Sequence, residues 1–415
     1  MSIARPRIML YSHDTYGLGH LRRSLSVATQ LSKDLPTASQ LLITGSIVPG
    51  AFALPERLDM VKLPALSKRS DGRYKARTLP MSLGQISEWR SQMILQAAQA
   101  YQPDLLLVDK SPAGVRKELL PTLSYLKSWL PGTRLVLGMR DIEDSPQATL
   151  AEWQAEDVRK LHEQVYDCII LYGEREVFDP VVEYQMSPAA SRKLIPVGYL
   201  GNVTPTKTRD EVRRELQVGD LPLIVVTVGG GGDGFDLIRT YLEALQSGDL
   251  AAGAAHTLIV TGPLMAKGKK ELLRQAAQFE NLSMLEFTHE LVNYMAAADL
   301  VVSMAGYNTV REALTLNCRL LLVPRIRPRV EQLMRARALA ERNLARFVSP
   351  DELSPQRLAQ EMRISLAQPR PRMSLNFNGV QAASELISNL LAGNQPIAGN
   401  YYAHQPLAVL QGAER

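Results

Sequence analysis

The chain has 415 residues, with 47 Lys and Arg against 42 Asp and Glu and a formal net charge of +5. This small, dispersed excess excludes a strongly basic nucleic-acid-binding protein, but it suits an anionic small ligand. The length exceeds that of one ordinary domain, and 46% of the residues are hydrophobic, so we expect two domains with sizeable cores.

The sequence contains no apolar run that approaches the roughly 20 residues needed to span a bilayer. Its start, MSIARPRIMLYSH, lacks the apolar core of a secretory signal peptide. We therefore expect a cytoplasmic protein, at most peripheral to the inner face of the membrane. Cys168 and Cys318 lie in apolar runs without metal-ligand spacing, which predicts buried thiols in a reducing compartment.

In the first half of the chain, short apolar runs alternate with longer helical patterns. This rhythm favours a parallel sheet with crossover helices, and the absence of strict alternation within each run indicates strands covered on both faces. A helix is predicted from about His20 to Lys33. The predicted strands are Ile8–Tyr11, Gln40–Thr44, Leu105–Val108, Leu135–Leu137 and Cys168–Tyr172.

The pattern breaks around Gly198–Thr208, whose Gly, Pro, Thr and charged residues are typical of a linker. A second doubly wound domain is predicted after it, followed by a helix near Gly379–Leu391. We expect a first domain at 1–203, a second at 204–376, a C-terminal helix at 377–393, and a polar tail at 394–415 whose composition allows disorder. The second-domain strands are Leu223–Val228, His256–Val260, Ser283–Glu286, Leu300–Ser303 and Leu320–Val323.

Ligands of open α/β sheets bind beyond the carboxyl ends of the strands, so the loops after the strands are where chemistry is expected. In the first such loop, Gly17 and Gly19 permit a tight turn and a close ligand approach. A dinucleotide fingerprint would need Gly or Ala where Arg22 stands, which argues against NAD. His20 either faces the cleft or merely caps the helix. Arg22 and Arg23 either bind a substrate or phosphate, or lie on a solvated helix face.

Two acidic residues, Asp109 and Asp141, also follow first-domain strands and would line the first-domain side of the cleft. Asp141 either orients or assists a base or forms a buried ion pair with Arg140. Between them, the leucine-rich stretch 119–130 could touch a membrane, but a helix facing the core is favoured.

In the second domain, a strand leads into four consecutive glycines, Gly229, Gly230, Gly231 and Gly232, and then into a helix. Backbone N–H groups of such a loop can converge on an anion, so the pattern predicts a phosphate cradle. It is not a P-loop, because no Gly-Lys-Ser/Thr follows. A valine at Gly230 or Gly231 is expected to fill the cradle without preventing folding.

Two further strand ends in this domain carry polar clusters, SMAGYNTVREA and VPRIRPRVEQ. Thr309 and Glu312 have the spacing of a capping box, which competes with a ligand-binding role for Glu312. From Arg335 onward, the arginines are predicted to form a solvated basic helix.

The runs GGGGDG, AGYNTVREAL and VPRIRPRVEQ, in this order, resemble the MurG-type glycosyltransferases of glycosyltransferase family 28. The resemblance covers roughly residues 7 to 390 and is strongest from Val225 to Leu339. GLGHLRRSL also resembles the first loop of these enzymes and of related sugar-nucleotide hydrolases. The resemblance implies an α/β protein of the GT-B type, in which two Rossmann-like, doubly wound parallel-sheet domains face a cleft.

The resemblance also implies the donor contacts. Gly229 to Gly232 would approach the diphosphate of a nucleotide sugar, Asn308 and Thr309 at a helix start would face phosphate, and Glu312 would bind the ribose hydroxyls of a uridine-type donor.

In the same family, a pair of polar residues that matches Glu331 and Gln332 holds the donor sugar, although the MurG pattern has Gln in place of Glu331. His20 matches the first-domain histidine proposed as the base. Gly17, Gly19, Arg22 and Asp109 would lie on the acceptor side.

The function implied is an inverting hexosyl transfer from a UDP-sugar, without metal or other cofactor and without nucleic acid as partner. His20 would act as general base, while the glycine loop and helix starts at Gly232 and Thr309 would stabilise the departing diphosphate. The acceptor is unknown, and lipid-linked acceptors are common in the family. The alternatives are a sugar-nucleotide hydrolase or epimerase of the same fold, and a non-catalytic nucleotide-sugar-binding protein.

Overall fold

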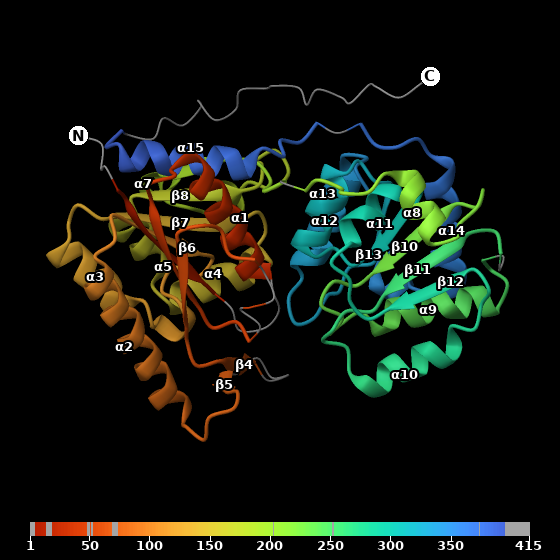
Figure 1. The fold of residues 1–415 in the computed structure, drawn as a ribbon, viewed down its shortest axis with the longest axis horizontal. Coiled ribbons are helices and arrows are strands. Elements are labelled where there is room, and N and C mark those ends of the chain that lie inside the picture. Colours follow the sequence, from red (N-terminus) through yellow and green to blue (C-terminus); the bar gives the residue numbers. More distant parts are fainter. Residues whose placement is uncertain are drawn as a thin grey trace.

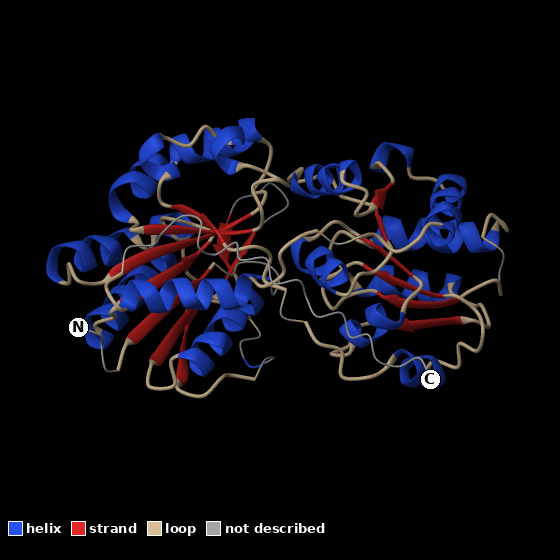
Figure 2. Ribbon diagram, turned by 90° about the horizontal axis from the view of Figure 1, so that it is seen from above, coloured by secondary structure: helices blue, strands red, loops and turns tan. Residues whose placement is uncertain are grey.

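The computed structural model describes residues 5–13, 19–47, 50, 53–68, 74–201, 203–250, 253–372 and 374–394. Two lobes lie side by side, each built on a parallel sheet (Figure 1). Helices cover both faces of each sheet (Figure 2), as expected for doubly wound domains.

The first sheet has the order β3-β2-β1-β6-β7-β8-β9, with parallel pairing throughout. All five predicted strands are confirmed. Two were missed, the edge strand β3, whose sequence LDMVK has no apolar run, and β9, which has three residues. The strands are β1 (Arg7–Ser12), β2 (Ser39–Thr44), β3 (Leu58–Lys62), β6 (Leu105–Asp109), β7 (Arg134–Arg140), β8 (Cys168–Tyr172) and β9 (Leu194–Pro196), and the hairpin β4 (Leu66–Lys68) and β5 (Tyr74–Ala76) stands apart.

The second sheet has the order β12-β11-β10-β13-β14-β15, again parallel. The five predicted strands are confirmed, and the two-residue edge strand β15 was missed. The strands are β10 (Leu223–Thr227), β11 (His256–Val260), β12 (Leu282–Leu285), β13 (Leu300–Ser303), β14 (Leu320–Leu322) and β15 (Arg346–Phe347).

Both helices predicted with bounds are confirmed. The helix predicted from about His20 begins at Gly19, and the helix predicted near Gly379–Leu391 ends at Leu391. The helices are α1 (Gly19–Asp34), α2 (Leu83–Tyr101), α3 (Leu120–Trp129), α4 (Pro146–Ala155), α5 (Val158–Lys160), α6 (Pro180–Glu183), α7 (Pro188–Ser191), α8 (Arg209–Glu215), α9 (Phe235–Gln246), α10 (Lys267–Ala276), α11 (Leu291–Ala297), α12 (Tyr307–Thr315), α13 (Glu331–Glu341), α14 (Pro355–Ala367) and α15 (Gly379–Leu391).

Burial on both faces explains the continuous apolar runs of the strands. Ile8 and Leu10 of β1 pack in one core cluster, and Met9 and Tyr11 pack in the cluster on the opposite face. Burying each such side chain contributes about 1.5–3 kcal/mol. Both cysteines are free and buried, as predicted.

The chain passes between the two lobes twice, and backbone hydrogen bonds join the two passages. Tyr199 donates its backbone N–H to the carbonyl of Asn376 at 2.7 Å, and Gly379 donates to the carbonyl of Tyr199 at 3.0 Å. Gly198 has φ +84°, and a Cβ there would lie 2.6 Å from the Asn376 oxygen, so this crossing requires glycine. We propose a boundary after residue 203, between β9 and α8, as the sequence predicts. After the second crossing, α15 packs against α1 of the first lobe.

The leucine-rich stretch around α3 faces the core, as favoured. Leu119, Leu123 and Leu126 are buried, whereas Leu120 and Trp129 are exposed. No helix in the described residues combines the length and the apolar character needed to cross a membrane. The predicted tail lies outside the described residues except for Asn394.

Candidate functional site

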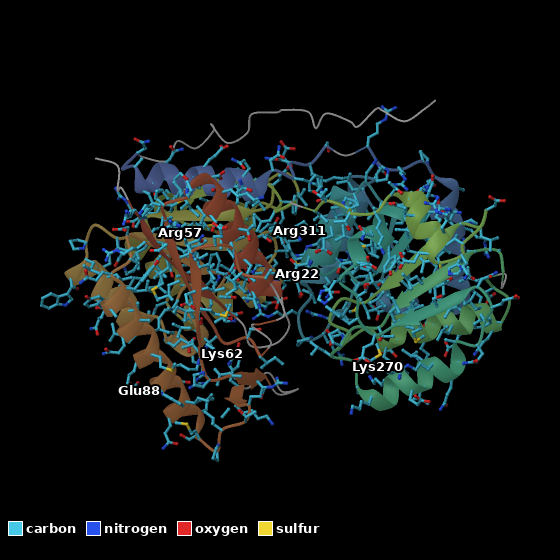
Figure 3. The ribbon with its side chains drawn as sticks, viewed as in Figure 1. Arg22, Arg57, Lys62, Glu88, Lys270 and Arg311 are labelled. Atoms are coloured by element: carbon cyan, nitrogen blue, oxygen red, sulfur yellow. The ribbon has the colours of Figure 1, made fainter. Side chains whose placement is uncertain are left out.

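The candidate site lies where the carboxyl ends of strands from both sheets meet. The Tyr307 hydroxyl of α12 donates to the backbone carbonyl of Tyr172 at the end of β8 at 3.0 Å. A Cβ on Gly19 would lie 3.1 Å from the side-chain nitrogen of Asn308, so the first-domain loop closely approaches α12. Figure 3 places Arg22 and Arg311 at this junction. Gly17, also predicted for this loop, lies outside the described residues.

On the first-domain side, His20 and Asp109 form a close pair. The Nδ1 atom of His20 lies 2.6 Å from Oδ2 of Asp109. Arg23 donates to both Asp109 oxygens at 2.7 Å, and its Nη2 lies 2.8 Å from the same Nδ1. Because β1 and β6 are neighbours in the sheet, the residues that follow or end them are brought together. Arg23 is buried, so the solvated helix face, one of the two alternatives left open for it, is wrong.

The neighbouring charges determine the protonation state of Asp109 in this pair. Burial alone would raise the pKa of Asp109, but the charges of Arg23 and His20 outweigh it and hold the pKa well below its usual value. The carboxylate therefore stays ionised and can accept a proton that His20 carries on Nδ1. A neutral imidazole protonated at Nδ1 has a lone pair on Nε2, which is the arrangement that a general base needs.

His13 is a residue that the sequence reasoning did not single out. Its ring lies 5.3 Å from that of His20, edge to face, and its Nδ1 is buried with no partner among the described residues. Burial, with the charges of Lys110 and His20, holds the pKa of His13 well below its usual value. The signal in the sequence was its position one residue beyond the central strand β1.

Asp141 has a different partner from the one predicted. Its two carboxylate oxygens accept from Arg335 at 2.8 and 3.0 Å, and Arg335 also donates to the Ala305 carbonyl. The pairing with Arg140 is wrong, since Arg140 contacts Glu143 at 3.2 Å. The solvated helix predicted from Arg335 onward is also wrong at Arg335, which is 2% exposed. The pair therefore ties the domains together and leaves Asp109 as the acid beside His20.

Glu312 lies at the junction, and it is not a cap. Helix α12 begins at Tyr307 with Gly306 as N-cap, so Thr309 is already inside the first turn and the predicted capping box is wrong. The Glu312 carboxylate is buried, and its Oε1 accepts from Arg22 at 2.5 Å and from Arg311 at 3.2 Å. The residue thus faces charged groups at the predicted donor site.

The glycine loop packs more tightly than its sequence indicates. A Cβ on Gly231 would overlap the carbonyl oxygen of Thr261, in the loop after β11, and Leu264 donates to the Gly230 carbonyl at 2.8 Å. The expectation that valine at Gly231 leaves folding intact is therefore wrong. Gly229 is exposed, and its Cβ direction points toward the Thr309 hydroxyl at 3.8 Å.

The backbone around this loop retains donors for an anion. The amides of Gly231 and Gly234 close turns within the loop, whereas those of Gly229, Gly230 and Gly232 donate to no backbone carbonyl among the described residues. The helix starts differ from those predicted at Gly232 and Thr309: α9 begins at Phe235 and α12 at Tyr307. The first turn of α12 contains Asn308 and Thr309, both half-buried.

Glu331 and Gln332 begin α13 and are both buried, with Arg325 between them and the glycine loop. Arg325 contacts Glu331 at 2.7 Å through Nη2 and Asp233 at 3.0 Å through Nε. The Gln332 side-chain oxygen accepts from the Arg325 backbone at 3.3 Å. Glu331 Oε2 is buried and has no hydrogen-bond partner among the described residues, so it is available to accept a hydrogen bond from a ligand hydroxyl. Arg325 and Asp233 were not predicted.

Comparison with known proteins finds a family for one part of the chain. Residues 224–387 match the glycosyltransferase family 28 C-terminal domain. A relative from Oceanobacillus iheyensis, UDP-N-acetylglucosamine--N-acetylmuramyl-(pentapeptide) pyrophosphoryl-undecaprenol N-acetylglucosamine transferase, is 28% identical over 181 residues. The aligned part spans 42% of this chain and 48% of the relative, about half of its length.

Solved structures align over almost the whole chain. Acinetobacter baumannii MurG has a TM-score of 0.56 at 17% identity, covering 94% of this chain and 99% of that one. A putative UDP-N-acetylglucosamine 2-epimerase from Listeria monocytogenes has a TM-score of 0.64 at 12% identity, covering 94% and 98%. At these identities the likeness establishes the fold and not the reaction. The chain therefore has the GT-B fold, with a second domain similar to the glycosyltransferase family 28 C-terminal domain.

Proposed function

We propose that the protein transfers a sugar from a UDP-sugar to an acceptor hydroxyl, with inversion and without a metal ion. The observation that carries the proposal is the His20–Asp109 contact of 2.6 Å, placed beside the first turn of α12 in the domain similar to family 28. This contact supports the proposal because an imidazole can accept a proton, and His20 lies next to the domain that is similar to a glycosyltransferase family.

In this mechanism, His20 Nε2 takes the proton of the acceptor hydroxyl while Asp109 holds the imidazole through Nδ1 and stabilises the imidazolium that forms. The acceptor oxygen attacks the anomeric carbon from the side opposite the diphosphate, through a transition state with oxocarbenium character. One displacement therefore inverts the anomeric centre.

The second domain would stabilise the departing diphosphate. Glycine-loop amides and the first turn of α12 present N–H groups, and Arg22 and Arg311 add positive charge. These groups supply the stabilisation that a divalent cation would otherwise give. Glu312 would bind the ribose, and Glu331 and Gln332 the donor sugar.

The proposed donor is a UDP-sugar, first to be tested as UDP-N-acetylglucosamine because the similar transferase has it in its name. That name also contains a pyrophosphoryl-undecaprenol acceptor, so a lipid-linked acceptor at the inner face of a membrane is the first class to test. Glu331 is a departure from the MurG pattern and is the residue on which the choice of donor sugar is expected to depend.

The test is a melting-temperature screen with nucleotide sugars, followed by chromatography of UDP release with and without EDTA. A ligand that binds only the folded state raises the melting temperature. We expect stabilisation by UDP-sugars and acceptor-dependent turnover that survives EDTA. Rapid release of free sugar without acceptor would assign a hydrolase, and binding without turnover a binding protein. Failure of every nucleotide sugar to stabilise the protein would contradict the proposal.

A further inference from the structure

Arg22 and Glu312 make an ion pair across the domain junction, between residues 290 positions apart. Both Arg22 and Arg311 contact the same oxygen, Oε1, at 2.5 and 3.2 Å. Among the described residues, no hydrogen bond ends on Oε2. The Glu312 side chain is 2% exposed, whereas that of Arg22 is 40% exposed. The carboxylate is therefore fixed in the second domain, and Arg22 can leave it.

The charges around this pair do not balance. Three arginines, at positions 22, 23 and 311, face two carboxylates, Asp109 and Glu312. Arg23 is committed to Asp109 through both oxygens, and Arg311 is buried. The cluster thus carries one positive charge in excess, and Arg22 is its exposed arginine, beside the close approach of Gly19 to Asn308. A cation at this place favours an anionic ligand.

A ribose diol needs two acceptor oxygens, and Arg22 occupies one of the two that Glu312 offers. We propose that Arg22 exchanges partners when the donor binds. The ribose hydroxyls take both oxygens of Glu312, and the released guanidinium turns to the donor diphosphate. The guanidinium fork matches phosphate geometry, and a partly exposed ion pair is weak enough to be replaced. This inference rests on the proposed function.

If Arg22 exchanges partners, its removal changes the affinities for uridine and UDP in opposite directions. A residue that only competes for Glu312, or that only supports the fold, would change both affinities in the same direction. Uridine has the ribose and no phosphate, so Arg22 only competes with uridine for Glu312 and weakens its binding. UDP also has a diphosphate, so the displaced Arg22 contacts UDP and strengthens its binding. Removal of Arg22 therefore changes the two affinities in opposite directions.

The experiment compares Arg22→Ala with the parent, Arg22→Lys, and the control Arg57→Ala, which alters an exposed first-domain arginine. Calorimetry measures UDP binding, and ligand-observed NMR measures uridine binding. Arg22→Ala should weaken UDP binding by about ten- to a hundredfold, the scale for a lost hydrogen bond to a charged group, and should tighten uridine binding. Arg22→Lys should bind UDP with intermediate affinity, and Arg57→Ala should match the parent.

Every other combination overturns the exchange. Tighter binding of both ligands would make Arg22 a competitor only, weaker binding of both would make it a support for Glu312, and unchanged UDP affinity would remove it from the donor site. A parent protein that binds no UDP contradicts the proposed function instead, so the two failures are distinguishable.

Discussion

The two strand edges that meet at the junction use different chemistry. The first-domain edge is built from ionisable side chains, with His20, Asp109 and Arg23 in mutual contact. The second-domain edge has ion pairs too, but it adds the backbone amides of a glycine loop and a helix start, with a glycine at position 231, where a side chain would collide. In the proposed mechanism, the proton transfer would use the first-domain edge, where His20 can change its charge, and the departing diphosphate would use the second-domain edge, where the amide donors stay fixed.

The largest effect that tests this division is expected at His20. His20→Ala should lower turnover by about 10²–10⁴-fold, the usual contribution of a general base, with donor affinity nearly unchanged. His289→Ala, at an exposed second-domain histidine, is the matched control and should retain the parent rate. Acceptor-dependent turnover and UDP affinity are measured together. A rate within a few fold of the parent would leave the first-domain edge without its proposed role.

The next largest effect concerns the ion pair that joins the domains. Asp141→Ala leaves the Arg335 charge buried without its partner and should cost about 3–5 kcal/mol of unfolding free energy. The double variant Asp141→Leu with Arg335→Met removes both charges and should recover most of that loss. Urea unfolding measures both. Equal losses in the single and double variants would mean that the charges do not act as a pair.

Glu312 belongs to the second-domain edge, but its carboxylate also contacts Arg22 of the first-domain edge. Glu312→Gln keeps the shape but loses one acceptor oxygen, so UDP affinity should fall about ten- to a hundredfold. Because Arg311 then loses its buried counter-charge, the melting temperature without ligand should also fall. Calorimetry on protein verified as folded separates the two effects. Parent-like UDP affinity would restrict Glu312 to an ion-pair role.

The smallest effect is the pH dependence of stability that His162 of the first domain contributes. Burial, with the charge of Lys193, lowers the pKa of His162 to about 3, while the unfolded value is about 6.5. Between these values the unfolded chain binds the extra proton, so stability falls as pH falls, by up to about 1.4 kcal/mol per pH unit. His162→Gln should flatten this slope in urea unfolding from pH 7 to pH 5, whereas His289→Gln should not. An unchanged slope would contradict the assignment.

Sequence patterns predicted the parts of the molecule that depend on neighbouring residues. The buried strands were found because their runs are apolar on both faces, and the ligand-facing loops because they follow those strands. The edge strand β3 was missed because two of its five residues, Asp59 and Lys62, are polar and exposed. The capping box that competed with a ligand role for Glu312 required Thr309 as N-cap, whereas the observed N-cap is Gly306, three residues earlier.

Pairing across the domains could not be predicted in this way. Asp141 and Arg335 are 194 positions apart, and nothing in either local pattern specifies the other. The arginines of α13 are typical of a solvated helix when only the local sequence is considered, because Asp141, the partner of Arg335, lies in the other domain. Likewise, the contact of Gly231 with Thr261 depends on two loops that only the sheet order brings together.

With the domain boundary that we propose, the bonded crossings at Tyr199 and Asn376 and the packing of α15 on α1 would make the second domain an insertion within the first. The helix that covers α1 is the last one in the described chain, so during synthesis the first domain remains incomplete until α15 emerges. At about 5–20 residues per second, the stretch between residue 203 and α15 takes on the order of ten seconds or more to be made. Through that interval, the apolar face of α1 lacks its cover and is open to chaperones or to misassociation.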